Sequence, residues 1–145
     1  MRRKRGIEHN ALGRSRAGVS TKLHALVDGQ ARPLHLTLTP GHRHEATVAE
    51  ELVEHAQGKA FLADAGYDSD RIRKAVRAKR MKAVINPNPS RKKKPRLDKR
   101  LYARRYLIEC FFHKLKRFRA IATRYEKTTR NYLSLVHLAC ASLWL

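Results

Sequence analysis

Asp64 and Glu109 are acidic residues at two positions where a carboxylate can do chemistry in a strongly basic chain. Asp64 directly follows the short apolar segment Ala60–Ala63, with Gly66 just beyond it, and open α/β sheets place functional groups at this end of a strand. Glu109 is the one carboxylate in the stretch Tyr102–Lys116. Carboxylate oxygens are the ligands that Mg²⁺ prefers, and a few suffice when a substrate phosphate completes the shell. The pair therefore predicts a Mg²⁺ site, in which two ions can activate an attacking oxygen and stabilise a leaving one.

The spacing around Glu109 places it among basic and aromatic companions. Tyr102, Arg105, Glu109 and Lys116 are separated by three, four and seven residues, which on a continuous helix brings them within a stripe about 60° wide. We expect Glu109 to lie half sheltered at the edge of the buried face. A plainer interpretation also stays open, in which Arg105 and Glu109 form an i,i+4 ion pair on an amphipathic helix. Asp64 likewise has a plainer alternative, as a turn aspartate bonded to local backbone N–H groups.

The charge of the chain points to a polyanionic partner. Among 145 residues, 33 Lys and Arg stand against 12 Asp and Glu, for a net charge of +21. Such an excess favours nucleic acid, with an acidic membrane surface as the weaker alternative. The basic run Lys92–Lys94, between prolines, predicts a phosphate-binding loop. A basic RNA-binding protein of the ribosomal type would also fit the composition, but simple electrostatic binding needs neither Asp64 nor the stripe around Glu109.

Compartment and metal content are also indicated by residue type. The start of the chain has no apolar run of the secretory kind, and the apolar C-terminal stretch of roughly 14 residues is too short to cross a bilayer. Cys110 and Cys140 lie in helical, largely apolar stretches, which suits reduced thiols in the cytoplasm. His42 and His44 match no structural zinc spacing. We therefore expect a cytoplasmic, nucleoid-associated protein without zinc and without a membrane partner.

Hydrophobic periodicity and turn residues predict the elements that position these groups. A basic, irregular arm covers residues 1–18, and one domain covers residues 19–145. The expected elements are a β-hairpin over 20–39 turning at Asp28-Gly29, a helix over 44–56, a strand over 60–63, a helix over 70–80 capped by Asp68 or Ser69, a strand over 82–86, a loop over 87–96, a helix over 98–118 and a terminal helix over 131–145. This order predicts an α/β domain with a mixed sheet and flanking helices.

Several segments resemble one family closely. Tyr102, Arg105, Glu109 and Lys116 fit the pattern Y-x2-R-x3-E-x6-K around the catalytic glutamate of bacterial insertion-sequence transposases. "GRSRAGVSTKLHALVDGQARPL", "LTPGHRHEAT", "LADAGYDSD" and "FRAIATRYEKTTRNYLSLVHLACASLWL" resemble the same group. The chain is similar, over about residues 11–145, to the C-terminal part of a DDE transposase of the insertion sequence 5 type.

The resemblance implies a ribonuclease-H-like fold of the retroviral integrase superfamily, with Mg²⁺-dependent DNA cleavage and strand transfer at transposon ends. Mn²⁺ would substitute for Mg²⁺. Asp64 matches the second catalytic aspartate and Glu109 the glutamate, both as metal ligands. Tyr102, Arg105 and Lys116 match the accessory positions, whose basic members contact DNA, as we expect of Lys92–Lys94. The implied partners are transposon inverted-repeat ends, target DNA and a second copy in a homodimer.

One departure from the family pattern concerns the first aspartate, which lies upstream of "GRSR" on the first strand of the sheet. The chain offers no aspartate before Asp28, which falls in the predicted hairpin turn. We expect a fragment that lacks the first strand, depends on an upstream transposase polypeptide and is a poor catalyst alone. The alternative is a catalytically inactive DNA-binding remnant that competes for transposon ends.

Overall fold

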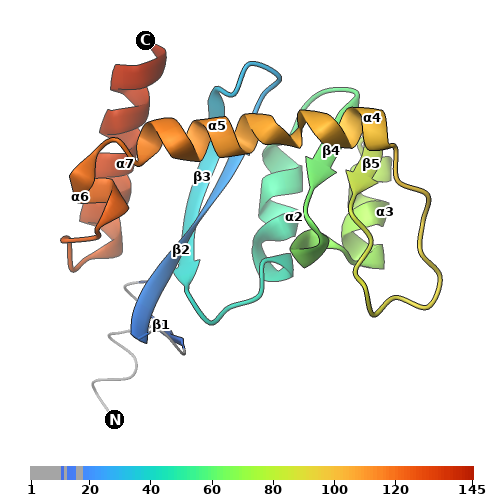
Figure 1. Cartoon of the computed structure of the whole chain (residues 1–145), viewed down its shortest axis with the longest axis horizontal. Coiled ribbons are helices and arrows are strands. Elements are labelled where there is room, and N and C mark those ends of the chain that lie inside the picture. The colour runs from blue at the N-terminus through green and yellow to red at the C-terminus, as the bar shows by residue number, and fades with distance from the viewer. Residues whose placement is uncertain (1–10, 12, 16–17) are drawn as a thin grey trace. The chain divides into compact units, whose positions relative to one another are not determined.

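The computed structural model describes residue 11, residues 13–15 and residues 18–145 (Figure 1). Most of the predicted basic arm lies outside these residues. The exception is Gly13–Ser15, which forms strand β1 and pairs with Gly18–Ser20, so this part of the arm is not irregular. The chain divides into two compact units, one holding residues up to Arg43 and from Ile108 to Leu145, the other holding His44–Leu107.

The first unit is built on the predicted hairpin. Strands β2 (Gly18–Val27) and β3 (Pro33–Pro40) pair antiparallel, from Thr21 opposite Pro40 to Val27 opposite Pro33. The connection spans residues 28–32 because the Asp28 carboxylate accepts hydrogen bonds from the N–H groups of Gln30 (2.8 Å) and Arg32 (3.0 Å). Ala31, at φ 61°, takes the left-handed conformation there. The hairpin and its turn are confirmed, although the turn is set by Asp28 and Ala31.

Helices α5 (Tyr106–Leu115), α6 (Arg119–Ala122) and α7 (Thr129–Trp144) supply the apolar core of this unit. Phe111 and Leu115, at i and i+4, are buried with Val136, and the Phe111 ring lies 5.3 Å from the Trp144 ring. The Tyr132 hydroxyl donates to the Ile121 carbonyl (2.9 Å) and so ties α7 to α6. The terminal helix is confirmed, while α6 was not predicted.

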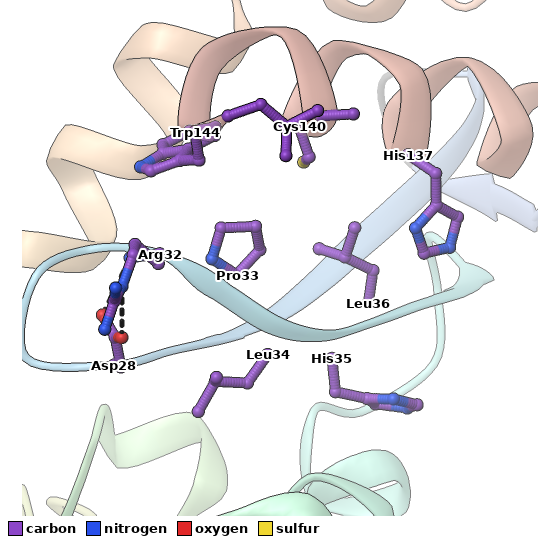
Figure 2. A pocket seen from close by; sticks show the side chains of 11 residues that line it. Asp28, Arg32, Pro33, Leu34, His35, Leu36, His137, Cys140 and Trp144 are labelled. Atoms are coloured by element: carbon purple, nitrogen blue, oxygen red, sulfur yellow. Dashed lines mark hydrogen bonds and ion pairs between the residues drawn. The ribbon is translucent and has the colours of Figure 1, made fainter.

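A groove of about 550 Å³ separates α7 from β3 in this unit (Figure 2). Cys140 and Trp144 of α7 face Pro33 and Leu36 of β3 across it. The charged groups drawn there are Asp28 and Arg32, which pair with each other at 2.8 Å. The groove is lined by residues of the hairpin and of α7 and holds none of the predicted catalytic residues.

The second unit contains the parallel pair β4 (Ala60–Ala63) and β5 (Lys82–Ile85), with Ala60 opposite Lys82 and Ala63 opposite Ile85. Helix α3 (Asp70–Ala78) connects the strands and packs on β5 and on α2 (Ala46–His55). Helix α4 (Lys99–Tyr102) contacts both strands. The buried side chains that bind these elements together are Val48, Leu52, Val53, Phe61, Ile72, Val76, Val84 and Ile85.

The α/β class and nearly all predicted elements are confirmed, but the single mixed sheet is not. The described strands form two sheets, β1-β2-β3 and β4-β5. β1, β2 and β3 are hydrogen-bonded as antiparallel neighbours. β4 and β5 are hydrogen-bonded only to each other among the described strands, as a parallel pair connected by α3. The predicted helix over 98–118 is also wrong as one element, since it consists of α4, the 3₁₀ turn η2 (Ala103–Arg105) and α5.

Ser69 is one residue whose predicted role the structure confirms. Its hydroxyl accepts a hydrogen bond from the Ile72 N–H (3.2 Å) and caps α3. We expect Ser69→Ala to lower the free energy of unfolding by about 1 kcal/mol, because it leaves a helix N–H without its acceptor. Urea denaturation followed by circular dichroism measures this. The matched control is Ser134→Ala, at a hydroxyl that bonds back to the Arg130 carbonyl within α7, and an equal loss in both variants would contradict the capping role.

Candidate functional site

Asp64 stands at the carboxyl end of β4, as predicted. Its backbone is extended (φ −73°, ψ 168°) and it precedes the 3₁₀ turn η1 (Ala65–Tyr67), to which its side chain makes no capping hydrogen bond. The Asn86 N–H, at the corresponding end of β5, donates to the Ala63 carbonyl (3.1 Å). The interpretation of Asp64 as a turn aspartate bonded to local backbone is therefore wrong. Its side chain is 53% exposed and turns toward residues from a distant part of the chain.

Tyr102 and Arg105 are those residues. The Tyr102 hydroxyl donates to Asp64 Oδ1 (3.2 Å), and Arg105 Nη1 lies 3.0 Å from Oδ1 and 3.3 Å from Oδ2. The Arg105 guanidinium also lies 5.7 Å from the centre of the Tyr102 ring. Side chains three residues apart eclipse in a 3₁₀ turn, so η2 aligns Tyr102 with Arg105. This geometry lets both side chains reach one carboxylate.

Tyr67 and Glu45 lie beside this site and were not predicted. Burial raises the pKa of Tyr67 to about 12, and the negative charges of Glu45 and Asp64 add to the effect. Gly66 leaves room for the Glu45 carboxylate, since a Cβ at Gly66 would lie 3.2 Å from Glu45 Oε2. Because burial raises its pKa, the Tyr67 phenol stays protonated at neutral pH. Glycine between Ala65 and Tyr67 was the one sequence signal of such a close approach.

A buried ion cluster holds the segment after Asp64. The Asp68 side chain has no solvent exposure and accepts hydrogen bonds from Arg73 Nε (2.7 Å), Arg91 Nε (2.9 Å) and the Asn88 N–H (2.8 Å). Desolvation alone would raise the pKa of Asp68, but these hydrogen bonds outweigh it and lower the pKa. Arg73 also donates to the Ile85 carbonyl (2.8 Å), at the end of β5. Asp68 thus connects η1, α3 and the chain that follows β5.

Lys92, Lys93 and Lys94 lie in that following loop, which has no regular secondary structure, as predicted, and all three are exposed. Arg91, next to them, is bonded to Asp68 and also donates to Asp70 Oδ1 (2.6 Å). At the far end, Lys82 Nζ pairs with Asp98 Oδ2 (2.5 Å), and Asp98 caps α4 through the Leu101 N–H (3.0 Å). The lysines are therefore presented on a loop whose two ends are fixed within the second unit.

Glu109 and Lys116 belong to the first unit. Glu109 is exposed on α5, so its predicted half-sheltered position is wrong. The reason is its place on the helix, because the face of α5 that packs into the core carries Phe111 and Leu115, and Glu109 projects roughly 140° from that face. Lys116 is exposed and follows the end of α5. The structure thus brings Asp64, Tyr102 and Arg105 together, with Glu109 and Lys116 in the other unit.

The remaining candidate residues are one aspartate, two histidines and two cysteines. Asp28 uses both carboxylate oxygens within its own turn. His42 and His44 are exposed at the end of β3 and before α2, and Cys110 and Cys140 are free thiols. Among residues 11, 13–15 and 18–145, no three His, Cys, Asp or Glu side chains gather closely enough to hold a metal ion. Within the same residues, no helix is long and apolar enough to cross a membrane.

Asp64 nevertheless fits Mg²⁺ by its chemistry. It is a partly exposed carboxylate at the carboxyl end of a strand, and its side chain makes no capping hydrogen bond to η1. Mg²⁺ keeps several of its waters and takes one or two carboxylates together with substrate phosphates. A single carboxylate in the second unit is thus compatible with such an ion.

Comparisons with known proteins agree on one family. The family model described as "Transposase DDE domain" matches residues 3–144. A Brucella ovis protein named "Putative transposase for insertion sequence element IS6501" is 46% identical over 130 residues, which cover 88% of this chain and 99% of that protein. No solved structure matches the chain.

Proposed function

Because the chain belongs to the transposase DDE domain family and is a transposase of an insertion sequence, we propose that it acts in Mg²⁺-dependent DNA cleavage and strand transfer at the ends of such an element. The proposal includes a ribonuclease-H-like fold and the use of Mn²⁺ in place of Mg²⁺. Bound at Asp64 and Glu109, the metal would polarise the phosphodiester and activate the attacking oxygen. The relative's printed name, with its insertion sequence element, supports the same substrate class.

The observation that carries the proposal is the contact of Asp64 with Tyr102 and Arg105. Asp64 was assigned as a site residue from its position after a short strand, and Tyr102 and Arg105 from their spacing to Glu109. The two assignments are independent, and the segments are 38 and 41 residues apart in the chain. Their meeting at one carboxylate supports a shared site for metal and DNA.

In this proposal, some residues of the chain hold the metal and others bind the DNA. Asp64 and Glu109 hold the metal, while Tyr102 orients the Asp64 carboxylate through its hydroxyl. Arg105, Lys116 and Lys92–Lys94 bind phosphate, which suits the net charge of +21 and the charge-assisted hydrogen bonds of basic side chains. DNA ends and target DNA are the proposed partners, with a second copy of the chain in a homodimer, in the bacterial cytoplasm at the nucleoid.

The test is cleavage of a labelled duplex that carries the element's inverted repeat, in Mg²⁺, in Mn²⁺ and in EDTA. We expect metal-dependent cleavage that falls about 10³-fold or more in Asp64→Asn, since metal stabilisation of the transition state is worth several kcal/mol. The assay is run on the full chain. Equal cleavage by the wild type and Asp64→Asn would overturn the proposed site, and DNA binding without cleavage by either protein would instead support a DNA-binding role.

A further inference from the structure

Arg105 occupies the same carboxylate that the proposed function assigns to a metal ion. Its guanidinium lies within 3.3 Å of both oxygens of Asp64, and Tyr102 donates to Oδ1 as well. A carboxylate has about four lone-pair positions, so the single hydrogen bond from Tyr102 leaves room for a metal ligand bond. A guanidinium and a divalent cation on one carboxylate repel each other, because both are positive.

The pair is placed so that exchange is easy. The Asp64 side chain is 53% exposed and that of Arg105 is 28% exposed, and ion pairs at the surface contribute little to stability. Arg105 therefore loses little when it leaves the carboxylate. Its guanidinium carries N–H donors in a planar fork, a geometry that suits phosphate oxygens.

We propose that Arg105 acts as a switch between Asp64 and DNA phosphate: without metal it neutralises Asp64, and when metal takes Asp64 it is released to bind DNA. This rests on the proposed function, in which Asp64 is a metal ligand. Binding free energies are reciprocal, so metal tightens DNA binding by the same factor by which DNA tightens metal binding. Arg105 is a positioning residue that makes the chain bind DNA most firmly when it is loaded with metal.

The direct test measures Mn²⁺ binding to the full chain without DNA, by electron paramagnetic resonance of the free ion. The part of the binding that Asp64→Asn removes belongs to Asp64. We expect Arg105→Gln to tighten this part about five-fold or more, within the usual range of coupling between sites, since the competing cation is gone. Arg104→Gln, an exposed neighbour with the same charge change, should leave it unchanged.

A second readout needs no metal. In EDTA, Asp64→Asn should bind a labelled duplex several-fold more tightly than the wild type, because Arg105 is released. This gain should vanish when Asp64→Asn is made in the Arg105→Gln background, as a double-mutant cycle shows directly. Glu54→Gln, at an exposed carboxylate on α2, controls for the loss of one negative charge in the same unit.

The outcomes separate the two proposals. If Asp64→Asn binds Mn²⁺ like the wild type, Asp64 is not a metal ligand and the proposed site fails. If Asp64→Asn loses Mn²⁺ but Arg105→Gln leaves the affinity unchanged, the switch is wrong while the proposed function stands. If circular dichroism shows that Arg105→Gln does not fold, Arg105→Met replaces it, since Met also removes the charge and keeps an unbranched apolar side chain of similar length. An unchanged Mn²⁺ affinity in that variant likewise contradicts the switch.

Discussion

Replacement of Asp68 by Asn is expected to lower the free energy of unfolding by about 3–5 kcal/mol, the usual cost of breaking a buried ion pair by removing one partner. The Asp68 side chain is fully buried, and it faces Arg73, which is only 5% exposed. Asn keeps the shape but not the charge, so the Arg73 guanidinium would be left buried without its counter-ion. Urea denaturation followed by circular dichroism measures the loss, and amide hydrogen exchange should locate it in residues 68–91.

Asp70 provides the matched control for this prediction. It bonds to the same Arg91, at 2.6 Å, but its side chain is 87% exposed, so Asp70→Asn should cost less than about 1 kcal/mol. If both variants lose the same stability, burial of Asp68 is not the cause, and the cluster would be an ordinary surface network.

The pH dependence of stability gives an independent check on Asp68. Its pKa in the folded chain is lowered from the ordinary 3.8. The ionised form therefore stabilises the fold at pH values above 3.8, and this contribution is lost as the pH falls through the lower, folded value. The stability difference between the wild type and Asp68→Asn should therefore shrink in that acidic range.

Local sequence patterns were enough to predict most of the helices and strands of both units. β4 begins and ends as predicted, because four apolar residues are followed by Asp64 and Gly66. Ser69 starts α3 and Asp28 sets the hairpin turn, since both side chains bond to backbone within their own segment. In each case the interactions that decide the structure lie within a few residues, where a single sequence shows them.

The errors arose where contacts distant in sequence decide the structure. Residues 98–118 contain neither Gly nor Pro, so no helix-breaking residue in the segment predicts the 3₁₀ turn η2. The turn lies where the side chains of Tyr102 and Arg105 contact Asp64, which precedes them by 38 and 41 residues in the sequence. The cluster of Asp68 with Arg73 and Arg91 escaped prediction for the same reason, because Arg91 is 23 residues away in a basic loop that looks solvated.

Glu109→Gln is expected to reduce metal-dependent cleavage about 10³-fold or more while it leaves the fold and DNA binding intact. Loss of a metal ligand removes several kcal/mol of transition-state stabilisation, and each 1.4 kcal/mol corresponds to about a factor of ten in rate. Glu109 is exposed on α5, so its conversion to an amide leaves no buried group unsatisfied. Cleavage of the labelled duplex, thermal melting and DNA affinity in EDTA are measured on the same preparation.

The expected pattern decides between the two interpretations of the stripe around Glu109. If Glu109 only forms an i,i+4 ion pair with Arg105, Glu109→Gln should cost less than about 0.5 kcal/mol of stability and leave the cleavage rate unchanged. Glu54→Gln, at an exposed carboxylate on α2, controls for the loss of one charge elsewhere on a helix. A large loss of cleavage in Glu109→Gln alone, with unchanged melting, would make Glu109 a metal ligand, and equal cleavage in both variants would reduce it to a helix-stabilising residue.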